Sequence, residues 1–349
     1  MRIAHVVWGM ETGGVETMLA NIINEQVVSH KVSLFIINDF IEESIIKKIS
    51  PQCIIKRINR RPKTKDYFKI AKMNFLIWLF RPDIIHVHSY RVSTLLKGRW
   101  RIVRTIHNTH NRTDEYPKMS ALYAISNAVK DYTTNQGFPN VTVVENGIDT
   151  KSFKKKKDYT IKDNIYHIVQ VGRLFSSQKG QDILLRAISI LVNKKNVKNF
   201  TLHFIGTGES EDSLKIMAND LKISDYVCFE GFRDQDYIKE NLCSYDLFVQ
   251  PSRYEGFGLT VAEAMAAKVP VLVSDIEGPM EIIDNGKYGM HFKKEDAIDL
   301  ADKLEIILNG GYDYSMICPA YDYVKNHYDV SITAKKYIEE YKRVINRHS

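Results

Sequence analysis

The sequence of 349 residues is long enough for two domains of ordinary size, each with its own core. Its 44% hydrophobic and 26% charged residues are typical of a soluble globular protein, and no run approaches the ~18 consecutive apolar residues of a membrane-spanning helix. The net charge of +7 comes from the first part of the chain: residues 1–150 carry 21 Lys/Arg and 13 Asp/Glu, whereas residues 151–349 carry 28 Lys/Arg and 29 Asp/Glu. We therefore expect the first part to bind an anionic partner.

Glu11 and the glycines after it interrupt the apolar start of the chain, so we expect no signal peptide. The cysteines lie far apart and form no C-x-x-C pair; they are Cys53, Cys228, Cys243 and Cys318. This usage is typical of reduced thiols, and it predicts a cytoplasmic protein.

Apolar runs rich in β-forming residues predict six strands in the first half, at residues 2–8, 32–37, 83–88, 102–106, 121–125 and 141–144. After the first of these, Gly13 and Gly14 precede an amphipathic helix whose apolar residues fall at offsets 0, 3, 4, 7 and 8 from Val15. A glycine pair between a strand and a helix is typical of a phosphate-binding loop, which raises the question of whether a nucleotide binds here.

A basic segment at residues 56–65 precedes an aromatic, apolar helix at residues 67–80. Two interpretations fit equally well. The pair could be an interfacial membrane element, or a buried helix with a solvated basic loop before it. Nucleic acid is the weaker alternative, because no nucleic-acid motif accompanies the charge.

Residues 153–164 have no apolar period and contain four consecutive lysines, so we expect a linker there. Beyond it, strands are predicted at residues 166–171, 200–205, 226–229, 246–250, 269–274 and 288–292, with a helical face over 184–191 between the first two. Strands that alternate with helices predict parallel sheets covered on both faces. We therefore expect an α/β protein of two Rossmann-like, doubly wound domains, 1–158 and 159–329, that face each other across a cleft.

The run PSRYEGFGLTVAEAMA (residues 251–266) follows a predicted strand and leads into a helix. Gly256 and Gly258 predict a loop that folds over the helix start, whose free N–H groups favour a phosphate. Without other context, Thr260 and Glu263 would form a capping box, in which Glu263 merely bonds the backbone.

The segment EGFGLTVAE (255–263) resembles the E-x7-E motif of retaining glycosyltransferases of the GT-B fold, the group 1 or family 4 set. Further landmarks follow in the family's order: GGVE (13–16), DIIHVH (83–88), RTIH (104–107), VENGID (144–149), VQVGRL (169–174) with Lys179 and Gly180, FIGTGE (204–209), DLFVQPS (246–252) and PVLVSDIEG (270–278). The resemblance spans roughly residues 1–290 and is greatest to capsule and exopolysaccharide enzymes. In this family the C-terminal helix crosses back to the first domain, so the resemblance implies that residues 330–349 pack on the first domain.

The chemistry of the residues in these motifs fits the transfer of a sugar from a nucleotide. A sugar nucleotide leaves a diphosphate whose negative charge grows in the transition state, and Arg173 and Lys179 suit that charge. The alternative is that both are ordinary surface cations of a solvated loop. The resemblance implies that Glu263 holds the ribose hydroxyls and that Glu255 contacts the donor sugar. The expected donor-binding residues are Gly13, Gly14, Arg173, Lys179, Glu255, Gly256, Phe257, Gly258, Leu259, Thr260 and Glu263.

The resemblance also places His107 beside the reacting sugar carbon, so His107 and Glu255 are the expected catalytic residues. His86, His88 and His110 are rivals of His107. Two histidines without a carboxylate or cysteine make a poor zinc site, so we interpret His86 and His88 as packing or cleft-wall residues. The D-x-D at Asp234 and Asp236 begins a predicted helix, where acidic side chains suit the dipole. We therefore expect no metal and no cofactor.

The sequence thus predicts a cytoplasmic, metal-independent, retaining glycosyltransferase, peripheral at the inner membrane face. Its donor would be a nucleotide-diphosphate sugar, with uridine the expected base, and its acceptor a saccharide, expected to be lipid-linked, in surface polysaccharide biosynthesis. The alternatives are a UDP-sugar epimerase or hydrolase on a similar fold, a catalytically silent sugar-nucleotide-binding subunit, and a dinucleotide oxidoreductase. The last is disfavoured because the lone Gly206-Thr-Gly208 lacks a third glycine. In this interpretation the nucleotide belongs to the second domain, and Gly13 and Gly14 complete the site when the domains close.

Overall fold

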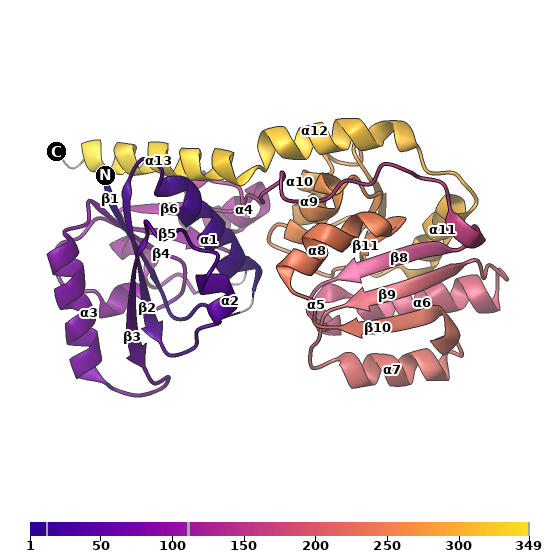
Figure 1. Ribbon diagram of the computed structural model, residues 1–349, viewed down its shortest axis with the longest axis horizontal. Coiled ribbons are helices and arrows are strands. Elements are labelled where there is room, and N and C mark those ends of the chain that lie inside the picture. The colour runs from indigo at the N-terminus through magenta and orange to yellow at the C-terminus, as the bar shows by residue number, and fades with distance from the viewer. Residues whose placement is uncertain (12, 110–111, 348–349) are drawn as a thin grey trace. The chain divides into compact units, whose positions relative to one another are not determined.

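The computed structural model describes residues 1–11, 13–109 and 112–347 (Figure 1). The chain divides into two compact units. The first combines Met1–Ile148 with Tyr328–Ser349, and the second is Asp149–His327.

The first unit is built on a parallel sheet of seven strands in the order β3-β2-β1-β4-β5-β6-β7. Its elements, in chain order, are β1 (Arg2–Val7), α1 (Gly14–Gln26), β2 (Lys31–Asn38), α2 (Glu43–Ile46), β3 (Ile54–Arg60), α3 (Tyr67–Phe80), β4 (Ile84–Val87), β5 (Ile102–Ile106), β6 (Ala121–Ala124), α4 (Asn127–Asn135), β7 (Val141–Val143) and α13 (Val330–Asn346). The strand order reverses between β1 and β4, which makes this position the switch point of the sheet.

Alternation along the strands of the first unit gives its sheet two apolar faces. Ile3 of β1 packs with α1, α2 and the C-terminal helix α13, whereas its neighbour Ala4 packs with α3 on the opposite face. The packing of α13 on this unit buries Tyr337 and Tyr341 completely. A segment far away in the sequence is therefore part of the first unit's core.

The second unit is built on a parallel sheet of six strands in the order β10-β9-β8-β11-β12-β13. Its elements are β8 (Tyr166–Val171), α5 (Ser176–Lys179), α6 (Gln181–Asn193), β9 (Phe200–Ile205), α7 (Glu211–Asp220), β10 (Val227–Gly231), α8 (Gln235–Asn241), β11 (Leu247–Gln250), α9 (Leu259–Ala266), β12 (Val271–Ser274), α10 (Glu277–Ile282), β13 (Met290–Phe292), α11 (Ala297–Leu308) and α12 (Ile317–His327). The core packs α6, α7 and α11 against the sheet, whose switch point lies between β8 and β11.

Two parallel α/β sheets confirm the predicted class of two doubly wound, Rossmann-like domains. The strand β3 is a correction, because its residues were read as part of a basic loop. Its pattern is hard to recognise since it is the outermost strand of the sheet and carries Lys56, Arg57 and Arg60, cations of the kind that protect sheet edges.

The expected boundary after residue 158 differs from the division that the contacts give, which falls after Ile148. The residues between these positions pack on the second unit. Phe153 is buried, Lys154 N–H donates to the carbonyl of Lys239, and Lys156 forms a buried ion pair of 2.8 Å with Asp246. The lysine-rich segment is therefore anchored to the second unit along its length, although its sequence is typical of a solvated linker.

Candidate functional site

The candidate site residues gather at the carboxyl ends of strands beside the two switch points. In the first unit, His88 follows β4, His107 follows β5 and Glu16 lies in the first turn of α1. In the second unit, Arg173 and Lys179 follow β8, and Glu255 follows β11. Ligands of doubly wound sheets usually bind at such positions.

A cavity of about 210 Å³ lies at the switch point of the first unit. It is lined by Val15, Glu16, His88, Ser89, Tyr90, Arg104, Thr105, His107 and Asn108. The cavity brings the first turn of α1, next to the predicted Gly13 and Gly14, together with the predicted His107. The rival His110 lies outside the described residues.

Both ring nitrogens of His107 are buried, and neither has a hydrogen-bond partner within the described part of the chain. Burial and, to a smaller extent, the positive charge of Arg104 together lower the pKa of His107 to about 4. His107 is therefore neutral near pH 7 and presents one donor and one acceptor to a ligand in the cavity.

Arg104 and Glu115 form an ion pair of 2.9 Å with both side chains only 2% exposed. The guanidinium carbon of Arg104 also lies 5.1 Å from the ring centre of Tyr116 and 5.8 Å from that of Tyr90. Glu115 in addition accepts a 2.9 Å hydrogen bond from the backbone N–H of Arg91. This pairing holds the cavity wall in one arrangement, because breaking it would leave a buried charge without compensation.

Glu16 is a cavity residue that the sequence analysis did not single out. A Cβ on Gly13 would lie 2.4 Å from Oε2 of Glu16, so a glycine allows this carboxylate to fold back over the start of α1. Burial raises the pKa of Glu16, and the negative charge of Glu11 raises it further, against a backbone hydrogen bond that lowers it. The carboxylate is poised to accept hydrogen bonds from a polar ligand.

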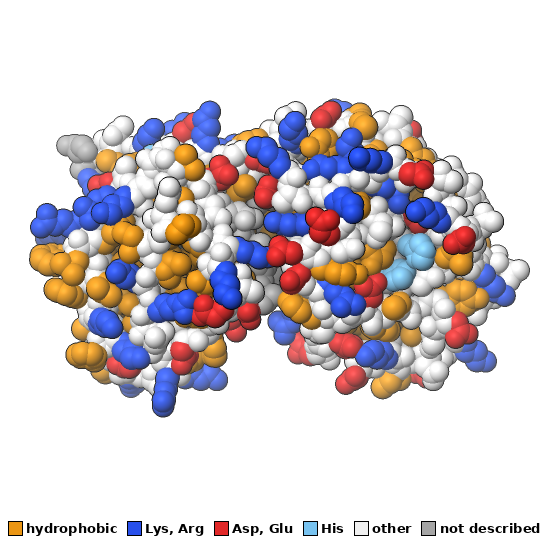
Figure 2. All heavy atoms as spheres, in the orientation of Figure 1, with side chains coloured by type: hydrophobic (Ala, Val, Ile, Leu, Met, Phe, Trp, Pro, Cys, Tyr) orange, Lys and Arg blue, Asp and Glu red, His pale blue; other side chains and the backbone are white. Residues whose placement is uncertain are grey.

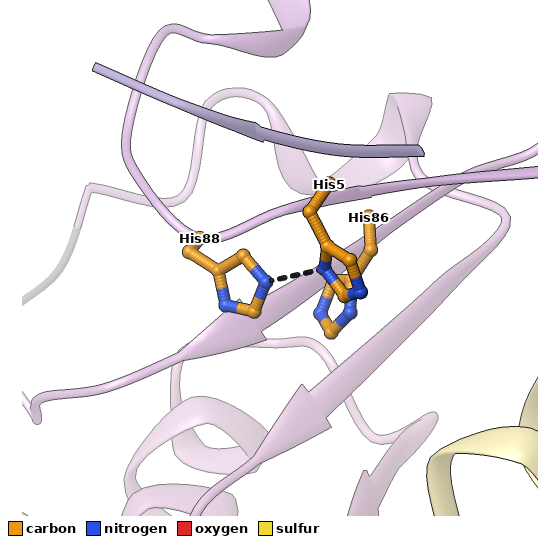
Figure 3. A group of neighbouring side chains, drawn as sticks. All are labelled: His5, His86 and His88. Atoms are coloured by element: carbon orange, nitrogen blue, oxygen red, sulfur yellow. Dashed lines mark hydrogen bonds between the residues drawn. The ribbon is translucent and has the colours of Figure 1, made fainter. Parts of the chain in front are cut away.

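Three buried histidines lie close together, His5 on β1, His86 on β4 and His88 directly after β4 (Figure 3). His5 Nδ1 lies 3.2 Å from Nε2 of His88, and its other nitrogen lies 2.8 Å from the side-chain oxygen of Gln26. His86 contacts the hydroxyls of Tyr341 at 2.6 Å and Thr105 at 2.7 Å. Burial lowers the pKa of all three imidazoles.

The three histidines have ligand atoms within 4.8 Å of one another, a spacing that could hold a metal ion. However, both nitrogens of His5 and of His86 are already engaged with protein partners, so a metal would have to displace those hydrogen bonds. The geometry favours neutral, packed imidazoles, with His86 in the interior and His88 on the cavity wall.

Three of the predicted residues of the second unit, Lys179, Glu255 and Thr260, meet in one polar group. Lys179 Nζ donates to Oε2 of Glu255, with the side chains 20% and 16% exposed. The same oxygen accepts a 3.2 Å hydrogen bond from Gln250, whose own oxygen accepts from the Thr260 hydroxyl at 2.7 Å. Gln250 lies in the landmark DLFVQPS (246–252), but the sequence analysis assigned no role to it. It connects the strand β11 to the first turn of α9.

Two glycines permit the close approach of these loops. Gly180 adopts a φ of +67°, and a Cβ there would lie 1.9 Å from the carbonyl oxygen of Pro251. Gly258 has a φ of +108° and is the N-cap of α9, so the helix begins at Leu259. Gly256 and Phe257 are buried in the same loop. Their positions bring the N-terminus of α9 next to Glu255.

Glu263 does not form the capping box that its spacing allows. Thr260 bonds Gln250, and Glu263 accepts a 2.8 Å hydrogen bond from Gln235 Nε2 at the start of α8. Burial raises the pKa of Glu263 to about 7, against the hydrogen bond from Gln235 and the charge of Lys239, which lower it. The prediction that the D-x-D begins a helix is confirmed, because Asp234 caps α8 by accepting a 2.8 Å hydrogen bond from the N–H of Tyr237.

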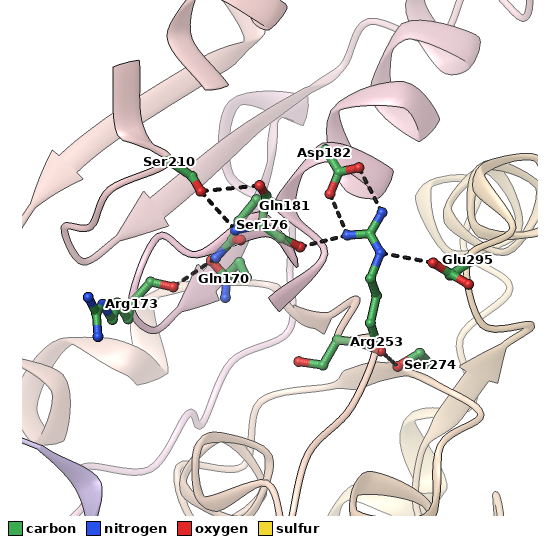
Figure 4. A network of polar contacts seen from close by, with 10 residues as sticks. Gln170, Arg173, Ser176, Gln181, Asp182, Ser210, Arg253, Ser274 and Glu295 are labelled. Carbon is green, nitrogen blue, oxygen red and sulfur yellow. Dashed lines mark hydrogen bonds and ion pairs between the residues drawn. The ribbon is translucent and has the colours of Figure 1, made fainter. Parts of the chain in front are cut away.

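Arg173 is exposed, and its side chain points away from the network around Arg253 (Figure 4). Its guanidinium carbon lies 5.9 Å from the ring centre of Phe175, and Gln181 donates to its carbonyl at 3.1 Å. Arg253, which the sequence analysis did not identify, bonds both oxygens of Asp182 at 2.7 and 2.8 Å and Oε1 of Glu295 at 2.9 Å. This fork ties the Glu255 loop to α6.

Two family models match adjoining parts of the chain. The model described as Glycosyltransferase Family 4 matches residues 12–152, and that described as Glycosyl transferases group 1 matches residues 151–320. The chain belongs to this glycosyltransferase family. Its two Rossmann-like units are those of the GT-B fold.

Individual relatives agree with the family assignment. An uncharacterised glycosyltransferase of Methanocaldococcus jannaschii is 31% identical over 213 residues, which cover 58% of this chain and 54%, or about half, of that protein. WclY, an O-antigen biosynthesis glycosyltransferase of Escherichia coli, is 22% identical over an alignment of 372 residues, which covers 94% of this chain and 98% of WclY. The structure of Anabaena HepE in complex with UDP and glucose has a TM-score of 0.80 at 18% identity, and the match covers 97% of this chain and 99% of that one.

The family motifs explain which residues the sequence could reveal. The resemblance assigns roles to Arg173, Lys179, Glu255 and Glu263, whereas it assigns none to the side chains that hold them. Gln235 lies on another helix, far from Glu263 in the sequence. Arg253 lies in the loop just before Glu255, but nothing in the sequence distinguishes it from an ordinary surface arginine. Glu16 was visible as the acidic residue in the first turn of α1, where the helix dipole favours a carboxylate.

Proposed function

We propose that the chain is a retaining glycosyltransferase that moves a sugar from a UDP-sugar to a saccharide acceptor, lipid-linked, in surface polysaccharide biosynthesis. The observation that carries the proposal is the position of Arg173, Lys179, Glu255 and the start of α9 in the segments that follow β8 and β11, beside the switch point of the second unit. The names of relatives give it further support, since HepE was solved with UDP and glucose and WclY acts in O-antigen biosynthesis.

In this proposal the second unit binds the donor. Arg173 and Lys179 neutralise the diphosphate, and the N–H groups from Phe257 to Thr260 contact its oxygens or the sugar. A charge-assisted hydrogen bond of this kind contributes ~1.5–3 kcal/mol. These two cations supply the charge that a divalent ion supplies elsewhere, so transfer is metal-independent. Glu263 accepts the ribose hydroxyls, for which its ionised form offers two acceptor oxygens.

Glu255 contacts the donor sugar rather than attacking it. Its carboxylate is engaged by Lys179 and Gln250, which lowers its availability as a covalent nucleophile. Retention then follows from attack of the acceptor on the face that the diphosphate leaves, with the departing phosphate oxygen taking the acceptor's proton. His107, Glu16 and the first turn of α1 line the cavity that orients the acceptor or the reacting sugar.

Release of UDP from a panel of UDP-sugars, measured with and without saccharide acceptors, tests the proposal. We expect acceptor-dependent release that persists with a chelator, and loss of most turnover in Arg173→Ala and Glu263→Ala while both variants remain folded. The matched controls are Arg186→Ala on α6 and Glu305→Ala on α11, which change the same residue types away from the switch point. Acceptor-independent product would favour an epimerase or hydrolase, and near-wild-type rates of both site variants would contradict the assignment.

A further inference from the structure

The helix α3 carries apolar side chains on its outward face. Phe68, Phe75, Trp78 and Leu79 are 81%, 56%, 54% and 51% exposed. Phe75 follows Phe68 by seven residues, and Trp78 and Leu79 follow Phe75 by three and four, so all four lie along one side of an α-helix. The rings of Phe75 and Trp78 are stacked with centres 6.0 Å apart. We call these four residues the α3 stripe.

The inward face of the same helix packs on the sheet of the first unit. Met73, Ile77 and Phe80 are buried against the sheet of the first unit. A helix that only covers a sheet needs one apolar face, with polar residues on the other. Packing within the described residues therefore explains the inward face but not the α3 stripe.

Positive charge surrounds the α3 stripe. Residues 56–81 contain nine Lys/Arg and one Asp/Glu. Arg61, Lys63 and Lys65 are exposed in the loop before α3, and Lys72 is exposed on the helix itself. None of these four side chains forms an ion pair within the part of the chain that the structure describes. Figure 2 shows orange and blue side chains together at the edge of the first unit where Figure 1 places α3.

We propose that the α3 stripe, together with the basic loop 61–65, docks the protein on an anionic lipid bilayer. The inference rests on the proposed function in one respect, because a lipid-linked acceptor would be found at such a surface. The helix of 14 residues is ~21 Å long, shorter than the ~30 Å hydrocarbon core. No helix among the described residues has the length and apolarity to cross a membrane. The helix therefore lies in the interface, with its aromatic residues at the level of the acyl boundary and its cations among the headgroups.

A second copy of the chain would fit this face less well than an anionic bilayer does. In a two-fold symmetric dimer the same patch meets itself. The basic loop and Lys72 would then face their own copies, and the segment offers only Asp66 to balance nine cations. A bilayer with anionic headgroups satisfies the apolar stripe and the charge together.

Co-sedimentation with lipid vesicles tests the inference. The full chain is mixed with vesicles of phosphatidylglycerol and phosphatidylcholine in equal parts, or of phosphatidylcholine alone. We expect binding to the anionic vesicles that weakens as salt rises. The variant Phe75→Ala/Trp78→Ala should lower the partition coefficient by about tenfold or more, because half-exposed aromatic area no longer enters the bilayer. Each of Lys63→Gln, Lys65→Gln and Lys72→Gln should lower it about fivefold.

The matched control is Ile298→Ala/Ile306→Ala, which removes two exposed apolar side chains from α11 beside acidic residues and should leave binding unchanged. Equal binding of the α3 stripe variant and this control would overturn the proposal. So would a dimer that the stripe variant abolishes, because the stripe would then meet a second copy. Transfer to a water-soluble acceptor separates the two proposals: its absence in the wild type contradicts the proposed function, whereas vesicle binding is judged independently.

Discussion

At the scale of single residues, the proposed role of Glu263 gives the most specific prediction. Its pKa is raised to about 7 by burial, so its carboxyl is about half ionised at neutral pH. If the carboxylate holds the ribose, UDP should bind more tightly as the pH rises through 7, because the ionised form is the better hydrogen-bond acceptor.

The affinity of the wild type relative to Glu263→Gln should therefore rise by about tenfold between about pH 6 and pH 8. Taking the ratio cancels the titration of the nucleotide's own phosphate. Isothermal titration calorimetry with UDP at several pH values measures it. A ratio that stays constant over this range would remove Glu263 from the ribose site.

At the scale of elements, α13 is connected to the first unit by hydrogen bonds as well as by packing. The Tyr341 hydroxyl lies 2.6 Å from His86 Nδ1, and the Tyr337 hydroxyl lies 2.8 Å from that of Thr105. Tyr341→Phe would leave a buried imidazole nitrogen without a partner, so we expect the free energy of unfolding to fall by ~1–3 kcal/mol.

Denaturant unfolding of Tyr341→Phe, compared with Tyr67→Phe, measures this loss. Tyr67 is 71% exposed, so removal of its hydroxyl should have no such effect. Equal unfolding midpoints for the two variants would mean that the hydrogen bond adds nothing to the docking of α13.

The strands and helices also show which parts of the fold can be predicted from the sequence alone. Strands such as β8 and β9 were predicted at their observed bounds, because buried parallel strands read as continuous apolar runs. The helix α3 was likewise placed at residues 67–80. The edge strand β3 was missed because its cations hide the alternation, and the anchoring of Lys156 to Asp246 was missed because it depends on a contact 90 residues away.

The same limit applies to the candidate site. Motifs placed Glu255 and Lys179 in one unit, but only the fold shows that their side chains meet. A cavity that joins α1 to His107 could not be read from separate motifs, because it depends on β1 and β4 lying side by side.

At the scale of the whole molecule, the buried histidines of the first unit and Glu263 of the second should respond to acid in opposite directions. Burial lowers the pKa of His5 to about 4, against the hydrogen bond that His5 donates to the side-chain oxygen of Gln26, which raises it. Burial also lowers the pKa values of His86 and His88. An unfolded histidine takes up its proton near pH 6.5, so the stability that these residues contribute is present above that pH and is lost as the pH falls toward 4. Between pH 7 and pH 5, His5 alone should cost the first unit roughly 2 kcal/mol.

Glu263 has the opposite sign in the second unit. Its pKa is raised in the fold, so its contribution is greatest below the unfolded value of 4.5 and declines as the pH rises through 7. Hydrogen exchange, corrected for intrinsic rates, should therefore show the first unit losing protection at pH 5 relative to pH 7, with no matching loss around Glu263. Parallel loss in both units would contradict the histidine account.

The central claim is that the nucleotide binds the second unit, and calorimetric titration of UDP into three full-length proteins tests it most directly. The wild type should bind UDP, and Arg173→Ala should weaken that binding by at least about tenfold, as loss of a charge-assisted contact implies. Gly14→Trp, at the glycine loop of the first unit, should bind UDP like the wild type yet lose turnover. A Gly14→Trp protein that loses UDP affinity while Arg173→Ala retains it would move the nucleotide to the first unit and contradict the account.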